Sequence, residues 1–399
     1  MSRNKLVDRT AITGVGWTPM VKKSGVSVLT LAVDASLDAI ADAGLVPTDI
    51  DGLVTYFWGI RDTPAPAQMA EALGLTSCNM SFCDGSGGAW AAAAIAAAAM
   101  AVQSGMCRNV LVYRAANARS EPSFLPGMDT WHSGQRQWNE PFGAAHPATL
   151  YGPHVSAWMH NHKLSNLDLA PLAVLQRGNA ALNRKALMTE PMTVADHQAS
   201  PWIVEPFRLL DCSVWNDGAV ALVVSATHDA RHGPSSVVSV RAVSGGTIGA
   251  PVRRNDAAAH WELNASVLAP ALYEQAGIRP SDIDIAEVYD PFTGVALMHV
   301  EQFGLVEPGS SPARIRHGEF ALDAKLSVNT NGGHLSEGST AGLGHVVEAV
   351  QQLRAGGVSD DFCTGDHDYD RRHCRQVRDP EFALVVGESG DSALILRRQ

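Results

Sequence analysis

The 399-residue sequence has few cysteines, few aromatic residues and no long hydrophobic run. Six cysteines are too few for a disulfide framework in a chain of this length, so we expect six reduced thiols and a cytoplasmic protein. The alanine-rich stretch at 89–101 falls short of the about 18 apolar residues that mark a membrane-spanning helix. The first residues, "MSRNKLVDRTAITG", contain no apolar signal core. Membrane and exported proteins are therefore not expected.

Positive charge is also scarce. The chain has 30 Lys and Arg against 41 Asp and Glu, a net charge of −11, and no basic run. This balance argues against nucleic acid and anionic membranes as partners. Hydrophobic residues make up 46% of the sequence, and the length suffices for two domains or one duplicated domain.

The most informative feature that is present is an internal repeat. Residues 38–56 read "DAIADAGLVPTDIDGLVTY", and residues 271–289 read "ALYEQAGIRPSDIDIAEVY". Each copy predicts an amphipathic helix, a glycine stop, a turn and an apolar strand. The copies are 233 residues apart, so Tyr56 matches Tyr289.

The repeat extends over both halves of the chain. "GSGGAWAAAAIAAAAMAVQSG" followed by "NVLVYRAA" parallels "GSTAGLGHVVEAVQQLRAGG" followed by "FALVVGES". Alternating strands and helices predict an α/β protein of two βαβαβ halves, residues 1–230 and 231–399, each with a mostly parallel, covered sheet. The first half holds an insertion at 118–205, with a helix predicted over 167–186. Such an insertion is typical of a lid or substrate-binding subdomain, or of an oligomer contact.

Four segments, in this order, resemble motifs of the thiolase superfamily, and the resemblance covers essentially the whole chain. They are "FRLLDCSVWNDGAVALVV" (207–224), "AEVYDPFTG" (286–294), "VNTNGGHLSEG" (328–338) and "LVVGESGDSALIL" (384–396). The second is similar to the "HDCF" segment of sterol-carrier-protein-type thiolases, and the last to the "C-x-GGG" segment. The resemblance implies the thiolase fold, with five layers in the order α-β-α-β-α.

The catalytic groups of that family are replaced in this sequence. The family's nucleophile opens a "C-x-S-G-x-x-A" motif, and this position falls on Gly85, two residues after Cys83. The histidine of the "G-H-P" loop falls on Ser339, and the second cysteine on Val385. The N–H groups of Gly85 and Gly387 are where the resemblance places the two donors that hold a thioester oxygen.

One branch of the superfamily shares these replacements, the thiolase-like aldolases of steroid side-chain degradation. They lack the cysteine, carry tyrosine at the position of Tyr289, and have a short "SEG-x-x-x-G" loop, here "SEGSTAG". Aldol chemistry beside a thioester needs an oxyanion hole, an acid and a base, but no cysteine. This chain departs from the branch at Ser339, where a second catalytic tyrosine is expected.

The resemblance therefore implies retro-aldol cleavage of a β-hydroxyacyl-CoA, with a bulky steroid-like or aromatic ketone leaving. Tyr289 would take the β-hydroxyl proton, Gly85 and Gly387 would hold the enolate oxygen, and His334, Ser339 or water would return a proton to carbon. One alternative is a thiolase or acyltransferase that uses Cys83 after a shift of the turn. Another is a non-catalytic subunit that scaffolds an active partner.

The same resemblance implies the partners. We expect no covalently bound cofactor, with coenzyme A present as part of the acyl-CoA substrate. A homodimer across the sheet of the first half is implied, as is a small OB-fold partner protein, often with a zinc ribbon.

Each candidate also has a purely structural interpretation. Tyr289 could be a packing residue, Ser339 a helix cap, and His334 a buried structural histidine. "CTGDHDYDRRHC" (363–374) contains two cysteines and two histidines, but its adjacent His373 and Cys374 are awkward ligands for one tetrahedral ion. We expect no metal site.

Overall fold

The computed structural model describes residues 7–57, 63–84, 87–120, 136–144, 146–230, 237–245, 265–354 and 369–399. Ten strands of the described chain form one sheet, and two short strands form a separate pair. The strands of the first half are β1 (Thr10–Trp17), β2 (Gly52–Tyr56), β3 (Met80–Asp84), β4 (Asn109–Asn117) and β7 (Asp217–Ala226). Those of the second half are β8 (Val238–Gly245), β9 (Ile285–Val288), β10 (Ser327–Val328), β11 (Phe382–Val386) and β12 (Ser392–Arg398).

The sheet consists of two blocks with the same strand order. The order is β3-β2-β4-β7-β1 in the first block and β10-β9-β11-β12-β8 in the second. The blocks join where β1 meets β8, through the pairs Ala11↔Ser239 and Ile12↔Val238. The duplication predicted from the repeat is therefore present in the strand order.

The strand directions agree with the prediction of a mostly parallel sheet in each half, because four of the five described strands run in one direction and only β7 and β12 are reversed. β2 is parallel to β3 and β4, and β9 is parallel to β10 and β11. β1 and β7, like β8 and β12, pair antiparallel with all their neighbours. Continuous apolar runs such as "GAVALVVS" indicated strands covered on both faces, which they are, but burial does not encode direction.

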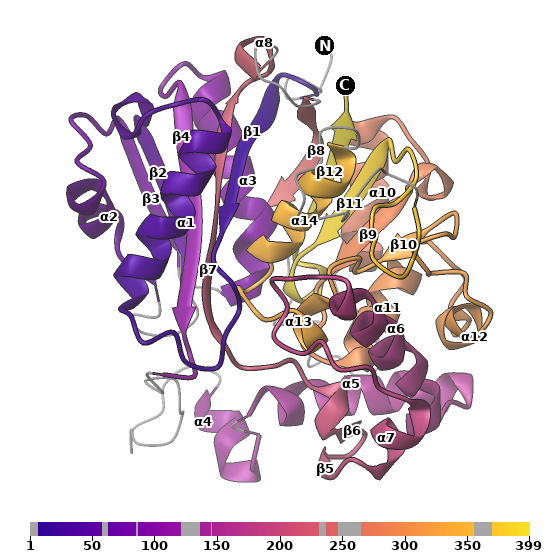
Figure 1. Cartoon of the computed structure of the whole chain (residues 1–399). Helices are drawn as coiled ribbons and strands as arrows, with labels where there is room; N and C mark the ends of the chain where they lie inside the picture. The colour runs from indigo at the N-terminus through magenta and orange to yellow at the C-terminus, as the bar shows by residue number, and fades with distance from the viewer. Residues whose placement is uncertain are drawn as a thin grey trace.

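Helices cover the sheet in layers, as the ribbon in Figure 1 shows. α3 (Ala91–Gln103) and α14 (Leu343–Leu353) pack on each other and on strands of both halves, so they form a shared middle layer. α1 (Val28–Asp42) and α2 (Pro66–Ala72) lie outside the first half, and α10 (Ala265–Ala276) and α11 (Thr293–Gln302) outside the second. This is the five-layer arrangement that the sequence predicts. The alanines of α3 suit this middle layer, because small side chains allow close packing on both sides.

The two repeat copies fold alike. Gly44 and Gly277 both have positive φ, 71° and 68°, and each ends the preceding helix. Asp51 accepts the backbone N–H groups of Arg108 and Asn109 at the start of β4. Its mate Asp284 accepts those of Glu381 and Phe382 at the start of β11, so the same contact sets the register in both halves.

The insertion lies over one end of the second half (Figure 1). It contains α4 (Arg136–Asn139), α5 (Pro147–His162), α6 (Ala170–Ala181), α7 (Val194–Ala199) and β5 (Trp202–Val204), which pairs with β6 (Phe207–Arg208). The predicted helix at 167–186 is present but shorter, because 166–168 form a 3₁₀ turn and the helix ends at Ala181. α5 and α6 pack on α11, and α6 also contacts α12 (Ser311–Arg316) and α13 (Gly333–Ser336). The short α8 (Thr227–Ala230) follows β7.

One expectation from composition is wrong. Cys374 is buried and disulfide-bonded, whereas Cys78, Cys83, Cys107 and Cys212 carry reduced thiols. The count of cysteines could not reveal this pairing, because it depends on which loops the fold brings together. Among the described residues, no helix is both long and apolar enough to cross a membrane.

Candidate active site

A cavity of about 220 Å³ lies where loops of both halves meet the insertion. Its wall includes Ala116 at the end of β4, Phe292 before α11 and Pro147 at the start of α5. The lining side chains that can titrate or offer a hydroxyl are Arg114, His146, Tyr151, Cys212, Ser213, Tyr289, Ser339 and Glu388. The insertion thus contributes to the cavity wall through α5.

Tyr289 directly follows β9 and is 6% exposed. Its ring packs against the turn before α3, where a Cβ on Gly88 would lie 2.5 Å from the Tyr289 hydroxyl oxygen. Only glycine leaves room there for the phenol. Burial, followed by the charge of Glu388, raises the pKa of Tyr289 well above its usual 10, so the phenol is neutral at neutral pH.

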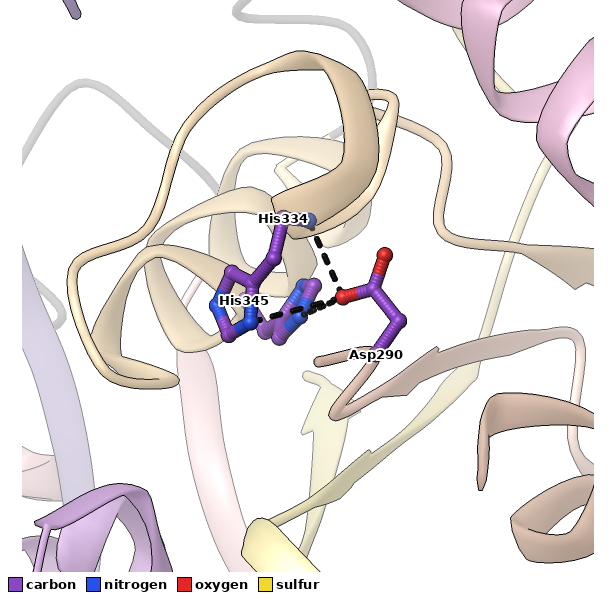
Figure 2. Close-up of side chains that lie close together, drawn as sticks. All are labelled: Asp290, His334 and His345. Carbon is purple, nitrogen blue, oxygen red and sulfur yellow. Dashed lines mark hydrogen bonds and ion pairs between the residues drawn. The ribbon is translucent and has the colours of Figure 1, made fainter. Parts of the chain in front are cut away.

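The imidazoles of His334 and His345 both lie close to the carboxylate of Asp290, as Figure 2 shows. Asp290 Oδ1 accepts the backbone N–H of His334 at 2.9 Å and lies 3.1 Å from Nε2 of His345. The other ring nitrogen of His345 lies 3.3 Å from Glu287. Burial alone would lower the pKa of His345, but its hydrogen bonds to Asp290 and Glu287 and their charges raise it to about 10. His345 is therefore an imidazolium held between two carboxylates.

His334 stands edge-on to the Tyr289 ring, with the ring centres 4.7 Å apart. Burial and the charge of His345 lower its pKa to about 3, so it is neutral, and its Nε2 is buried without a hydrogen-bond partner. It does not line the cavity among the described residues. The structure thus brings His334 to Tyr289 but leaves the phenol between this histidine and the cavity.

Asp290, His334 and His345 are also a possible cation site, because one donor atom of each lies within 4.8 Å of the others. In the described structure the donor atoms of Asp290 and His345 already serve other contacts. Asp290 binds the backbone of the His334 loop through both oxygens, and His345 bridges two carboxylates. A proton on His345 supplies the positive charge that the carboxylates need. In the 363–374 segment, where we expect no metal site from the sequence, Cys363 and His367 lie outside the described residues.

Ser339 lines the cavity in the loop that leads to α14. Its backbone N–H donates to Asn216 at 2.6 Å, and its hydroxyl lies 3.5 Å from the N–H of Ala341. The structure therefore places Ser339 in the same cavity as Tyr289.

Of the two predicted oxyanion donors, the N–H groups of Gly85 and Gly387, the structure describes only that of Gly387. Gly85 lies outside the described residues. The N–H of Gly387 donates to the carbonyl of Ser392 at 2.8 Å, so it is engaged in the connection between β11 and β12, contrary to its expected role as a donor to substrate. In the turn before α3, the N–H of Gly88 is also engaged, because it donates to Glu388 at 3.1 Å.

Two cysteines bear on a covalent mechanism. Cys83 lies on β3, the edge strand of the sheet, and does not line the described cavity. Cys212 does line it, but burial and the charge of Asp211 raise its pKa to about 12, and its thiol donates to the carbonyl of Arg208. Because the thiolate is the nucleophile, a thiol held protonated is inert.

Sequence reasoning missed Glu388 and Tyr151. Glu388 accepts the Tyr151 hydroxyl at 2.9 Å and the Gly88 N–H at 3.1 Å, and both side chains line the cavity. A signal for Glu388 was present, since a carboxylate stands in "GES" where the similar family segment has glycine. Tyr151 gave no signal, because its contact depends on how the insertion docks.

This geometry, two duplicated α/β halves with a cavity at their junction, is that of a thiolase-fold protein. The family model described as "Thiolase C-terminal domain-like" matches residues 254–361. Human mitochondrial 3-ketoacyl-CoA thiolase is similar in fold alone, with a TM-score of 0.65 at 14% identity and 99% of each chain covered.

Two curated relatives are more similar. The steroid side-chain-cleaving aldolase of Thermomonospora curvata is 37% identical over 361 residues, 88% of this chain and 91% of that protein. The 17-hydroxy-3-oxo-4-pregnene-20-carboxyl-CoA lyase of Mycobacterium tuberculosis is 35% identical, over 89% and 94% of the two chains. The solved structure of the Ltp2-ChsH2(DUF35) aldolase matches with a TM-score of 0.86, 33% identity and 98% of each chain. The chain therefore belongs to the thiolase superfamily, in the branch that contains the steroid side-chain-cleaving aldolase.

Proposed function

We propose that this protein is a carbon–carbon lyase that cleaves a β-hydroxyacyl-CoA by a retro-aldol reaction without a covalent cysteine intermediate. The observation that carries the proposal is the buried phenol of Tyr289 at the cavity, in a site whose one lining cysteine, among the described residues, is a protonated thiol. Such a site supports proton transfer and not acyl-enzyme formation.

In the proposed reaction, the β-hydroxyl proton passes to the Tyr289 oxygen while the phenol passes its own proton to a base, and a carbonyl forms at the β-carbon. The electrons of the breaking Cα–Cβ bond move into the thioester and give an enolate. Backbone N–H groups of the turn before α3 stabilise the enolate oxygen, and Gly85 keeps its proposed part in this. A proton is then returned to Cα, with Ser339 or a water that it holds at the cavity wall as the proposed donor.

The relatives suggest the substrate class. One is named for cleavage of steroid side chains and another for a 17-hydroxy steroid carboxyl-CoA. We infer that the leaving ketone is steroid-like, and that coenzyme A enters as part of the substrate.

The solved structure of a related aldolase supports one of the proposed partners. The matching solved aldolase is named as Ltp2 together with the DUF35 protein ChsH2, and we propose a partner of this OB-fold and zinc-ribbon type. Large apolar side chains are exposed on the insertion, among them Trp138, Phe142 and Trp202, as an interface requires. We also propose a homodimer through β3, an edge strand whose Phe82 and Cys83 are exposed.

Ser339 favours a second candidate, the non-catalytic subunit, because a serine is a poor substitute for a phenol as an acid near neutral pH. The two functions are separated by one experiment. The protein, alone and with a DUF35 partner, is incubated with a 17-hydroxy steroid carboxyl-CoA, and ketone and shortened acyl-CoA are measured by mass spectrometry. Equal amounts of both products support the lyase. Absence of products under both conditions would reject it in favour of the scaffold.

A further inference from the structure

Retro-aldol cleavage requires a group that accepts a proton, and Tyr289 cannot be its final acceptor. A neutral phenol can take the substrate's proton only while it passes its own proton to a base. His334 touches the Tyr289 ring but does not line the described cavity. His345 is already protonated between Asp290 and Glu287. The base must be found on the cavity side of the phenol.

Among the described residues that line the cavity, Glu388 is the carboxylate. It follows Gly387 at the end of β11, which is parallel to β9 and therefore ends beside the strand that carries Tyr289. The Tyr289 backbone N–H donates to Val386, two residues before Glu388, at 3.1 Å. The fold thus fixes Glu388 and Tyr289 on neighbouring strand ends.

Both groups also meet at Gly88. The Gly88 N–H donates to Glu388 Oε2, and a Cβ on Gly88 would lie 2.5 Å from the Tyr289 hydroxyl oxygen. The Tyr151 hydroxyl holds the other carboxylate oxygen at 2.9 Å. These two hydrogen bonds orient the Glu388 carboxylate at the cavity wall.

We propose that Glu388 is the catalytic base that exchanges protons with Tyr289. The inference rests on the proposed lyase function. As the β-hydroxyl proton moves to the Tyr289 oxygen, the phenol proton moves to Glu388, and the Cα–Cβ bond breaks to ketone and enolate. Glu388 then gives up its proton in the cavity, where Ser339 or a water that it holds passes a proton to Cα of the enolate. The carboxylate and phenol are regenerated, and the net change is transfer of one proton from oxygen to carbon.

The test compares Glu388→Gln with the matched control Glu381→Gln, an exposed carboxylate paired with Arg397. Turnover is measured on a β-hydroxyacyl-CoA that the wild-type protein cleaves, with folding checked by circular dichroism. We expect Glu388→Gln to lose about 10²–10⁴-fold in kcat with KM little changed, and the control to match the wild type. Formate should restore part of the activity of Glu388→Ala, because it replaces the missing carboxylate.

The pH profile separates a catalytic from a structural role. The titratable groups that share the cavity with Glu388 are Tyr289, Tyr151, Cys212, Arg114 and His146. The wild-type kcat should fall at low pH as Glu388 is protonated, and Glu388→Gln should lack this limb. Tyr151→Phe removes a hydrogen bond to the carboxylate, which raises its pKa and should move the limb to higher pH.

The outcomes distinguish the two proposals. If the wild-type protein cleaves no β-hydroxyacyl-CoA, with or without the partner, the proposed lyase function and the proposed role of Glu388 are both rejected. If the wild type is active and Glu388→Gln retains its kcat, only the role of Glu388 is rejected. The same holds if kcat drops but the acid limb persists and formate does not rescue Glu388→Ala.

Discussion

Tyr56 and Tyr289 occupy equivalent positions in the two halves and converge on one turn. The Tyr56 hydroxyl donates to the carbonyl of Ala341 at 2.8 Å, and a Cβ on the next residue, Gly342, would lie 3.2 Å from the Tyr289 ring. The Tyr56 hydroxyl is thus engaged in a structural hydrogen bond, whereas Tyr289 lines the cavity. Duplication has produced one structural and one candidate catalytic phenol.

This difference makes Tyr56→Phe the matched control for Tyr289→Phe. We expect Tyr289→Phe to lower turnover about 10²–10⁴-fold, because a proton-transferring group is lost while ring packing remains. Tyr56→Phe should lower the free energy of unfolding by about 1 kcal/mol and leave turnover per folded molecule nearly unchanged. Turnover, thioester binding and urea denaturation are measured for both. Normal turnover by Tyr289→Phe would mean that this tyrosine only packs.

Gly88→Ala should impair the site through sterics. The added methyl group would lie 2.1–2.5 Å from three atoms of Tyr289, so the phenol must move. Overpacking of this kind costs about 1–3 kcal/mol of stability, and turnover should fall with it. Gly178→Ala is the control, because its Cβ meets no atom within 4 Å and it lies inside α6. Wild-type kinetics in Gly88→Ala would contradict the described position of Tyr289.

Cys83→Ala should leave turnover within a few-fold of wild type, because Cys83 lies on β3 away from the described cavity wall. Intact-protein mass spectrometry after incubation with acyl-CoA should detect no acyl adduct. An adduct that survives denaturation and maps to Cys83 would instead support the alternative of a thiolase or acyltransferase with Cys83 as nucleophile.

Stability at alkaline pH should depend on His345. Its pKa is about 10 in the folded protein and about 6.5 in an unfolded chain, so its contribution is complete below about pH 6.5 and disappears as pH rises toward 10. Within this window the free energy of unfolding should fall by up to about 1.4 kcal/mol per pH unit. Urea denaturation at several pH values should show a smaller fall for His345→Gln. An identical slope in wild type and variant would rule out the charged histidine.

Thiol titration tests the pairing of Cys374. Under denaturing conditions without reductant, fewer than the six thiols of the sequence should react, and all six should react after reduction. Six reactive thiols before reduction, in protein protected from reducing agents, would contradict the disulfide.

The sequence predicted the features that local chemistry determines. A glycine after a helix, a proline turn and an apolar strand recur at Gly44 and Gly277, and they fold as predicted because their determinants lie within a few residues. Tyr289 and Ser339 were found by their place in family motifs, and both line the cavity. The reversed direction of β7 was not predicted, because β7 pairs with β1, about 200 residues away, and neither segment indicates its partner. Glu388 became a candidate only when its contacts to Tyr151 and Gly88 were seen.

The pairing of β7 between β1 and β4 also constrains the order in which the chain can fold during synthesis. β7 supplies the antiparallel neighbour of both strands, yet it begins only at Asp217. In a nascent chain that ends before Asp217, β1 and β4 therefore lack the strand that pairs with both of them. The pairing of β7 with β1 also closes a loop of about 200 residues, and contacts so distant in sequence form slowly. The first half can therefore complete its sheet only after the whole insertion has left the ribosome, although its three β-α units, β1-α1, β2-α2 and β3-α3, are synthesised far earlier.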